Sequence, residues 1–283
     1  MALFLPETAR NIVGNGSVPV NGINKPLIPL LSPKHPGSYN GSAREGHRKF
    51  PNPLAASKLL RFPDTAIILV AYGINYTVYC CLQASLSTLF VDIYHVSGVV
   101  AGLIYLPFGF AVALSAFATG RLLDINYRKT AAESGIAVTK GEATDLRDFP
   151  IERARLRVVK YSVALSAVLV MGYGWVLQAG VHMAVPLVFQ FFIGLTIQMV
   201  FTALNTLLVD THPDCPSTAQ AACNFVRCEM AAAFLAALDA MLRRLGPGWS
   251  FLFFGATLFF VFLALVLLQL KGMKWRSSRS LAG

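Results

Sequence analysis

Polar and aromatic side chains recur at helical spacing within an apolar stretch that begins near Thr65. They fall at positions i, i+3, i+4, i+7 and i+11, which places them on one face of a helix. They are Tyr72, Asn75, Tyr76, Tyr79 and Gln83. Phenol hydroxyls and amides can hydrogen-bond a small organic molecule, and phenol rings offer π-faces to a cation. The stripe therefore predicts one wall of a substrate cavity. The alternative is that it only joins neighbouring helices by hydrogen bonds.

A second polar stripe occupies a later apolar stretch and again lies on one helical face. It consists of Gln190, Gly194, Gln198, Thr202 and Asn205. The glycine could let a neighbouring helix or a ligand approach closely. Two stripes on separate helices favour a shared central cavity, and we assign Gln198 and Asn205 to its lining.

Six apolar stretches of about twenty residues position these side chains, and each could cross the ~30 Å hydrocarbon core of a bilayer as a helix. They lie at about 65–90, 98–120, 159–180, 184–209, 217–242 and 249–270. Only 13% of the residues are charged, against about 25% in soluble domains. The sequence therefore predicts an all-α membrane protein with six transmembrane helices. Of these, the third and sixth stretches are almost uniformly apolar and should face lipid on most sides.

Two residues inside the apolar stretches suggest moving or binding parts. Arg227 would lie about ten residues after Pro216, ~15 Å along a helix and near the bilayer midplane. A charge there is costly unless it is paired or hydrated. Arg227 is therefore either a substrate-site or gating residue or the structural partner of a carboxylate elsewhere in the bundle. Pro107 should kink the second helix near its middle, which suits a gating role.

The cations cluster outside the apolar stretches and set the expected topology. Eight lie in residues 1–61, nine between Arg121 and Lys160, and four from Lys271 onward. Under the positive-inside rule, these segments are cytoplasmic, and so are both termini. We expect a largely irregular segment over 1–61, a transmembrane domain over 62–271 with a cytoplasmic loop at 121–158, and a tail over 272–283. Topology then explains most of the net charge of +10, so nucleic-acid binding is not expected.

Enzymatic and metal chemistry have no sequence support. The five cysteines form no CxxC arrangement, and no histidine lies beside them at metal-ligand spacing. No nucleophile–base pattern or phosphate-binding glycine loop is present either. We expect a non-enzyme with no cofactor and no metal, whose partners are the lipid bilayer and a small organic substrate.

The segment from Gly120 to Lys129 resembles the loop signature of the major facilitator superfamily. It has a glycine, an aspartate four residues later and then a basic pair, although Ile125 and Tyr127 depart from the usual pattern. The resemblance implies gating roles for Asp124, Arg128 and Lys129. Asp124 can sit against the positive N-terminal end of the fifth helix, near residues 217–218. The basic pair can bridge to carboxylates or lipid phosphates in one conformation only.

Further segments are similar to fungal drug:proton antiporters of that superfamily, nearest the quinidine-resistance group. They are Phe4–Ser17, Gly102–Gly109, Asp148–Arg157 and Asn205–Asp210. The resemblance implies twelve spans in two halves, alternating access, and export of drugs, toxins or metabolites by proton antiport across the plasma membrane. In that family the first of these segments follows the sixth span. The chain is thus expected to be the C-terminal six-helix half of a major facilitator fold.

Three situations stay open. The chain could be a non-functional gene-model fragment, it could pair with an N-terminal six-helix half, or it could be a non-transporting membrane-embedded partner. We expect that the chain reconstituted by itself shows no substrate flux. If both polar stripes faced lipid or were fully paired with each other, a transport role would lose its basis.

Overall fold

The computed structural model describes residues 59, 62–133, 151–212 and 215–282. Side chains at 154, 158 and 274–282 are outside this description. The predicted segment over 1–61, the Phe4–Ser17 motif, the middle of the predicted loop and most of the predicted tail therefore lie largely or wholly outside the described residues.

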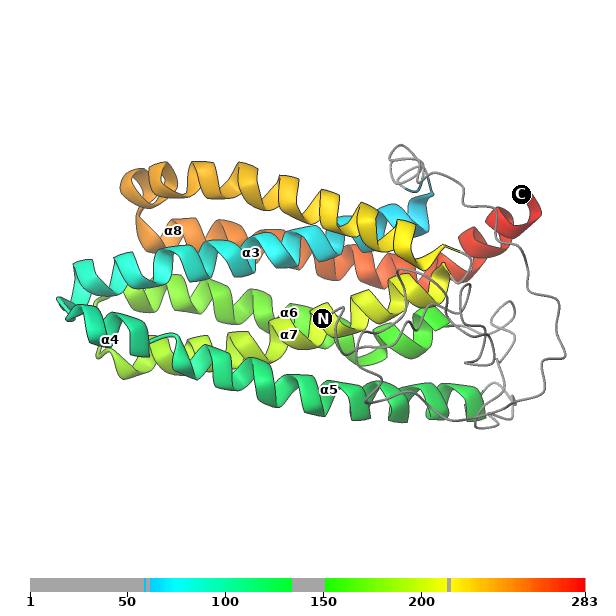
Figure 1. Cartoon of the computed structure of the whole chain (residues 1–283), viewed down its shortest axis with the longest axis horizontal. Helices are drawn as coiled ribbons and strands as arrows, with labels where there is room; N and C mark the ends of the chain where they lie inside the picture. The colour runs from blue at the N-terminus through cyan, green and yellow to red at the C-terminus, as the bar shows by residue number, and fades with distance from the viewer. Residues whose placement is uncertain (1–58, 60–61, 134–150, 213–214, 283) are drawn as a thin grey trace, which may run out of the picture. The chain divides into compact units, whose positions relative to one another are not determined.

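The described ranges are helical, and their long helices run side by side (Figure 1). The elements are α3 (Pro63–Tyr94), α4 (Gly98–Leu103), α5 (Leu106–Glu133), α6 (Ile151–Gln178), α7 (Ala184–Thr211) and α8 (Pro216–Ala282). Within the described residues, five helices are long and apolar enough to cross a membrane, with α4 and α5 counted as one. The predicted all-α fold class is confirmed.

The helix α8 folds back on itself, which accounts for the sixth apolar stretch. Its backbone leaves helical geometry at Gly246 (φ 78°, ψ 169°), directly before Pro247. Figure 1 shows the two arms of α8 returning alongside each other from this point. The Gly248 amide after the break donates a hydrogen bond to Gln178 Oε1 of α6 at 2.8 Å. The predicted six crossings are obtained when the arms, 216–245 and 247–282, are counted separately.

The second arm of α8 packs against α6, where we expected mostly lipid. Tyr173 of α6 is fully buried and meets Phe251 of α8 edge-on, with ring centroids 5.2 Å apart. Phe254, one turn further along α8, is buried as well. The opposite faces of both elements remain open. Two uniformly apolar helices can therefore share one face and leave the other to lipid, a division that hydropathy does not reveal.

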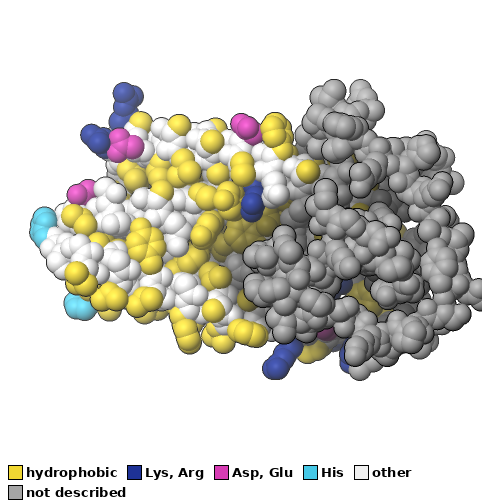
Figure 2. Space-filling view, viewed as in Figure 1, with side chains coloured by type: hydrophobic (Ala, Val, Ile, Leu, Met, Phe, Trp, Pro, Cys, Tyr) yellow, Lys and Arg dark blue, Asp and Glu magenta, His cyan; other side chains and the backbone are white. Residues whose placement is uncertain are grey.

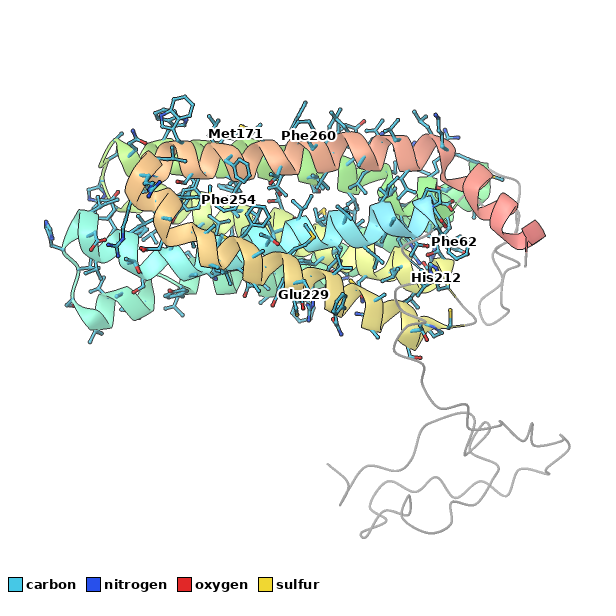
Figure 3. The ribbon with its side chains drawn as sticks, turned by 90° about the horizontal axis from the view of Figure 1, so that it is seen from above. Phe62, Met171, His212, Glu229, Phe254 and Phe260 are labelled. Carbon is cyan, nitrogen blue, oxygen red and sulfur yellow. The ribbon has the colours of Figure 1, made fainter. Side chains whose placement is uncertain are left out.

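Large apolar side chains cover much of the outer surface. Phe117 of α5 is 81% exposed and Phe260 of α8 is 68% exposed. Figure 3 shows Phe260 pointing out of the bundle, and Figure 2 shows hydrophobic side chains spread over one face between the helix ends. In water, such a surface would favour association. It matches helices surrounded by hydrocarbon, where apolar exposure costs little.

The second and third spans depart from their predicted bounds. A turn at residues 104–105 separates α4 from α5, and Pro107 follows as the second residue of α5. The second span, Gly98–Glu133, is thus interrupted directly before Pro107, as the predicted kink requires, and the gating role of Pro107 stays a prediction. The ends of the predicted loop 121–158 are helical, because a helix satisfies its own backbone and can continue beyond the apolar stretch.

The fold-back of α8 should depend on the glycine at its corner. A Cβ is strongly disfavoured at the φ and ψ of Gly246. We expect Gly246→Ala to destabilise the detergent-solubilised protein by about 1–3 kcal/mol. Thermal denaturation followed by circular dichroism measures this. Gly102→Ala is the matched control, because a Cβ there meets nothing within 4 Å. Equal melting temperatures for the two variants would contradict the assignment.

Candidate functional site

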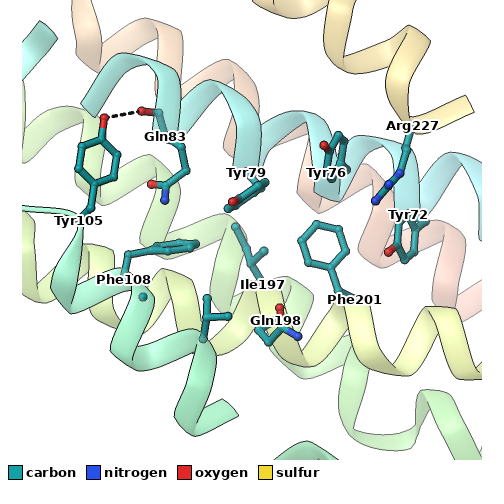
Figure 4. A pocket seen from close by; sticks show the side chains of 12 residues that line it. Tyr72, Tyr76, Tyr79, Gln83, Tyr105, Phe108, Ile197, Gln198, Phe201 and Arg227 are labelled. Atoms are coloured by element: carbon teal, nitrogen blue, oxygen red, sulfur yellow. Dashed lines mark hydrogen bonds between the residues drawn. The ribbon is translucent and has the colours of Figure 1, made fainter. Parts of the chain in front are cut away.

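A cavity of about 500 Å³ lies where α3, α5, α7 and the first arm of α8 meet (Figure 4). Twelve residues line it. They are Tyr72, Tyr76, Tyr79, Gln83, Tyr105, Phe108, Gly109, Val112, Ile197, Gln198, Phe201 and Arg227. Six of the eight residues that we predicted to line a substrate cavity are in this set; Asn75 and Asn205 are not.

The α3 wall is an array of tyrosines centred on one phenylalanine of α7. The ring of Phe201 lies 5.1 Å from that of Tyr72 and 6.1 Å from those of Tyr76 and Tyr79, between centroids. On the other side, Tyr79 contacts Phe108 of α5 at 5.7 Å. Tilted and edge-on rings at these distances attract one another. The array therefore gives the cavity a fixed aromatic wall.

Asn75 belongs to the helix contact instead. Its side chain is fully buried, and its Nδ2 donates to the Ile197 carbonyl of α7 at 3.4 Å. At about 100° per residue, Asn75 is rotated about 60° from Tyr72, whereas Tyr76, Tyr79 and Gln83 lie within about 40° of it. The prediction that Asn75 lines the cavity is wrong, because it occupies the edge of the stripe that packs on α7.

Asn205 also lies outside the lining, for a different reason. It shares a helical face with Gln198, but seven residues separate the two, or about 10 Å along α7. Its Oδ1 is buried and accepts no hydrogen bond from the described residues. The helical face on which Asn205 lies was therefore predicted correctly. The prediction that Asn205 lines the cavity is wrong, because the cavity ends before Asn205 along α7.

The residue Arg227 brings a charge to the cavity from α8. Its guanidinium carbon lies 4.6 Å from the centroid of the Tyr76 ring, a cation–π contact. The two helices pass closely here, since a Cβ on Gly73 would lie 3.7 Å from the Arg227 Cα. No carboxylate of the described residues pairs with Arg227. Figure 3 shows Glu229 projecting outward from the same arm, and its side chain is exposed.

Four lining residues from the start of α5 and the turn before it were not predicted. They are Tyr105, Phe108, Gly109 and Val112. Their spacing of i, i+3, i+4 and i+7 is a helical stripe, but a mostly apolar one, so polarity did not reveal it. The Tyr105 hydroxyl donates to the Gln83 carbonyl of α3 at 3.2 Å.

The crossing of α5 and α7 allows this α5 surface to reach the cavity. The glycine predicted to permit close approach, Gly194, does so. A Cβ there would lie 3.1 Å from both the Phe108 carbonyl oxygen and the Ala111 Cβ. One turn away, Ser115 Oγ of α5 donates to the Leu195 carbonyl of α7 at 2.7 Å.

The predicted gating residues lie at the far end of α5. The side chains of Asp124, Arg128 and Lys129 are exposed, and none forms an ion pair with a described residue. No hydrogen bond joins Asp124 to the first turn of α8 at residues 217–218, which is also described. A gating role for the three stays a prediction.

A different set of contacts joins the helices at this end. Arg155 of α6 pairs with Asp210 of α7 at 3.0 Å, and its guanidinium lies 5.3 Å from the Tyr127 ring of α5. A second pair, Arg157 with Glu133, links α6 to α5 at 2.8 Å. The segments that carry the family resemblance include Arg155, Arg157 and Asp210. The sequence did not indicate which acidic residue each arginine would pair with.

Loss of the half-buried pair should destabilise the bundle. The side chains of Arg155 and Asp210 are only 14% and 23% exposed, so Asp210→Asn leaves a sheltered guanidinium without its carboxylate. We expect a loss of about 1–3 kcal/mol in thermal denaturation. The control is Asp239→Asn, which removes the partner of Arg243 in a pair that is 75% and 80% exposed. Such exposed pairs contribute little, so an equal loss in both variants would argue against a stabilising role for Arg155–Asp210.

Comparisons with known proteins point to transporters. The chain is 33% identical to the MFS-type transporter phiD of a fungal species, over 97% of this chain and 42% of the relative. It is 30% identical to the MFS-type transporter phiL of the same source, over 89% of this chain and 63% of the relative. It is 32% identical to citrate exporter 1 of Aspergillus niger, over 98% of this chain and 54% of the relative.

The chain thus spans about half the length of these curated relatives, between 42% and 63%. No protein-family model matches it. Similarity to MFS-type transporters along nearly the whole chain, combined with several helices of membrane-spanning length among the described residues, supports an integral multi-pass membrane protein.

Proposed function

We propose that the chain forms the substrate-binding half of an exporter of small organic compounds that works by proton antiport in the plasma membrane, with both termini cytoplasmic. The cavity carries this proposal. Its volume of about 500 Å³ falls within the 300–1,000 Å³ usual for small-molecule sites. Its lining combines aromatic surface with a few polar groups, the composition that binds and orients organic ligands.

Polar groups that the bundle itself does not use support a ligand. Gln83 Oε1 and Arg227 Nε are buried at the cavity and have no hydrogen-bond partner among the described residues. A stripe that only held helices together would spend these groups on neighbouring helices. Unsatisfied polar atoms are costly away from water. A bound solute or water can satisfy them, which favours a transport pathway over a purely structural bundle.

The names of the relatives support a role in transport. The missing half of the pathway, the proton coupling and the class of exported compound are parts of our proposal. Two are named as transporters and one as an exporter of citrate. Since the chain covers about half of each, we propose that an N-terminal six-helix half, on the same or another chain, completes the pathway. Coupling to protons and export of drugs or toxins are further parts of the proposal, and they derive from the resemblance to fungal antiporters.

Gating is proposed to act at both ends of α5. At one end, the turn before Pro107 carries Tyr105, whose contact with Gln83 joins α5 to the cavity wall. At the other end, Asp124, Arg128 and Lys129 are placed to exchange partners with a neighbouring helix or lipid phosphate as the Arg155–Asp210 contact opens.

Filling the cavity should weaken ligand binding without unfolding the protein. A Cβ on Gly109 meets nothing within 4 Å, and this glycine lines the cavity. We expect Gly109→Leu to lower affinity for a bound small organic compound by about tenfold or more. Binding is measured by calorimetry on the purified full chain in nanodiscs, after a thermal-shift screen of candidate compounds. The matched control is Gly102→Leu, which has equal space and lies outside the lining.

Absence of any binding compound, or equal affinity of the Gly109→Leu and wild-type chains, would count against the cavity as the site. Flux tests the half-pathway separately. Proteoliposomes holding only this chain should show no counterflow, whereas co-reconstitution with the N-terminal half of phiD should produce it. Flux from this chain by itself would overturn the half-pathway proposal and leave the binding result intact.

A further inference from the structure

We infer that the cavity selects organic anions, and that Arg227 receives the carboxylate of the substrate. This inference rests on the proposed function, since it assigns a substrate class to the same cavity. It is drawn from the charge and the geometry of the twelve lining residues.

The cavity lining carries a positive charge and no negative charge. Arg227 is the one ionised side chain among the twelve, and no aspartate or glutamate faces it from α3, α5 or α7 within that set. An arginine in surroundings of low polarity requires a counter-charge or hydration. Because no described carboxylate supplies that charge, an anionic solute fits the site, and an organic cation would be repelled.

The surroundings of the guanidinium leave its Nε available. The group lies 4.6 Å from the centroid of the Tyr76 ring and within hydrogen-bonding reach of the Tyr72 hydroxyl. Its Nε has no hydrogen-bond acceptor among the described residues. In Figure 4 the side chain extends from α8 toward the tyrosines of α3. A guanidinium with its Nε available can bind a carboxylate through two parallel hydrogen bonds.

The rest of the lining indicates the body of the ligand. Tyr79, Phe108 and Phe201 surround the middle of the cavity with rings. Beyond them lies the unpaired Gln83 amide oxygen, about 10 Å along α3 from Tyr76. The expected substrate therefore carries a carboxylate at one end and an apolar or aromatic body in the middle. A hydrogen-bond donor at the other end would reach Gln83.

Three probes of one shape and different charge test this inference. They are 2-naphthoate, its neutral isostere 2-naphthamide and the cation 2-naphthylmethylammonium, each titrated into the full chain in nanodiscs at pH 7. We expect the carboxylate to bind at least about tenfold more tightly than the amide, the usual advantage of a charge-assisted hydrogen bond. The cation should bind more weakly than the amide.

Variants of Arg227 then test whether this residue causes the preference for the carboxylate over the amide. Arg227→Gln should bring carboxylate and amide within about twofold of each other, and Arg227→Lys should retain part of the preference. The matched control is Arg243→Gln, which removes the same charge from the same helix at a site that is 80% exposed, and should keep the full preference. If Arg227→Gln does not fold, the Arg227→Lys and wild-type titrations decide.

The outcomes separate this inference from the function on which it rests. If amide and carboxylate bind equally and Gly109→Leu weakens the binding of both, the cavity is a binding site and the anion assignment is wrong. Tighter binding of the cation, or a preference that survives Arg227→Gln, also overturns it. If none of the three probes binds, the anion assignment falls, whereas the proposed function fails only if the wider screen finds no ligand.

Discussion

Every backbone polar group in a hydrocarbon environment must find its partner inside the protein, and this constraint governs the described fold. A helix satisfies it locally, so each apolar stretch becomes a helix whatever its neighbours are. Side chains are then not needed to pair with backbone N–H and C=O groups, and most of them are apolar. Any polar side chain that remains inside must be satisfied by its own helix, by another helix, by water or by a ligand. The polar groups of α3, α7 and α8 divide among these possibilities.

The helix contacts decide which polar groups are left for a ligand. Asn75, Thr77 and Ser85 of α3 all donate to backbone carbonyls, the first across to α7 and the others within their own helix. Tyr79 and Gln83, on the same element, face the cavity. Adjacent turns of one helix thus form helix contacts and line the cavity separately. Arg227 reaches the cavity because α8 passes α3 closely at Gly73, a contact between residues far apart in the chain.

Close packing and ion pairing act at different depths of the bundle. Near the cavity, Gly194 lets α5 approach α7, so that apolar Phe108 can complete the aromatic wall. At the end of α5 away from the cavity, the helices continue beyond the apolar stretch and are joined by Arg155 with Asp210 and Arg157 with Glu133. Charges can pair there because the helix ends meet water, where ionised groups are less costly.

The sequence by itself determined the surrounding solvent, the helical class and the faces of α3 and α7 that carry polar groups. These follow from local properties, namely the length of an apolar stretch and the rotation of about 100° per residue. It did not determine which neighbour each face would meet. Asn75 fell on the edge that packs against α7, Asn205 lay beyond the end of the cavity, and the α5 wall of Tyr105 and Phe108 carried no strong polar signal. The pairing of Arg155 with Asp210 was also decided only by the tertiary structure. Periodicity specifies a direction around one helix, whereas contact depends on the crossing of two helices, which is set by residues distant in the chain.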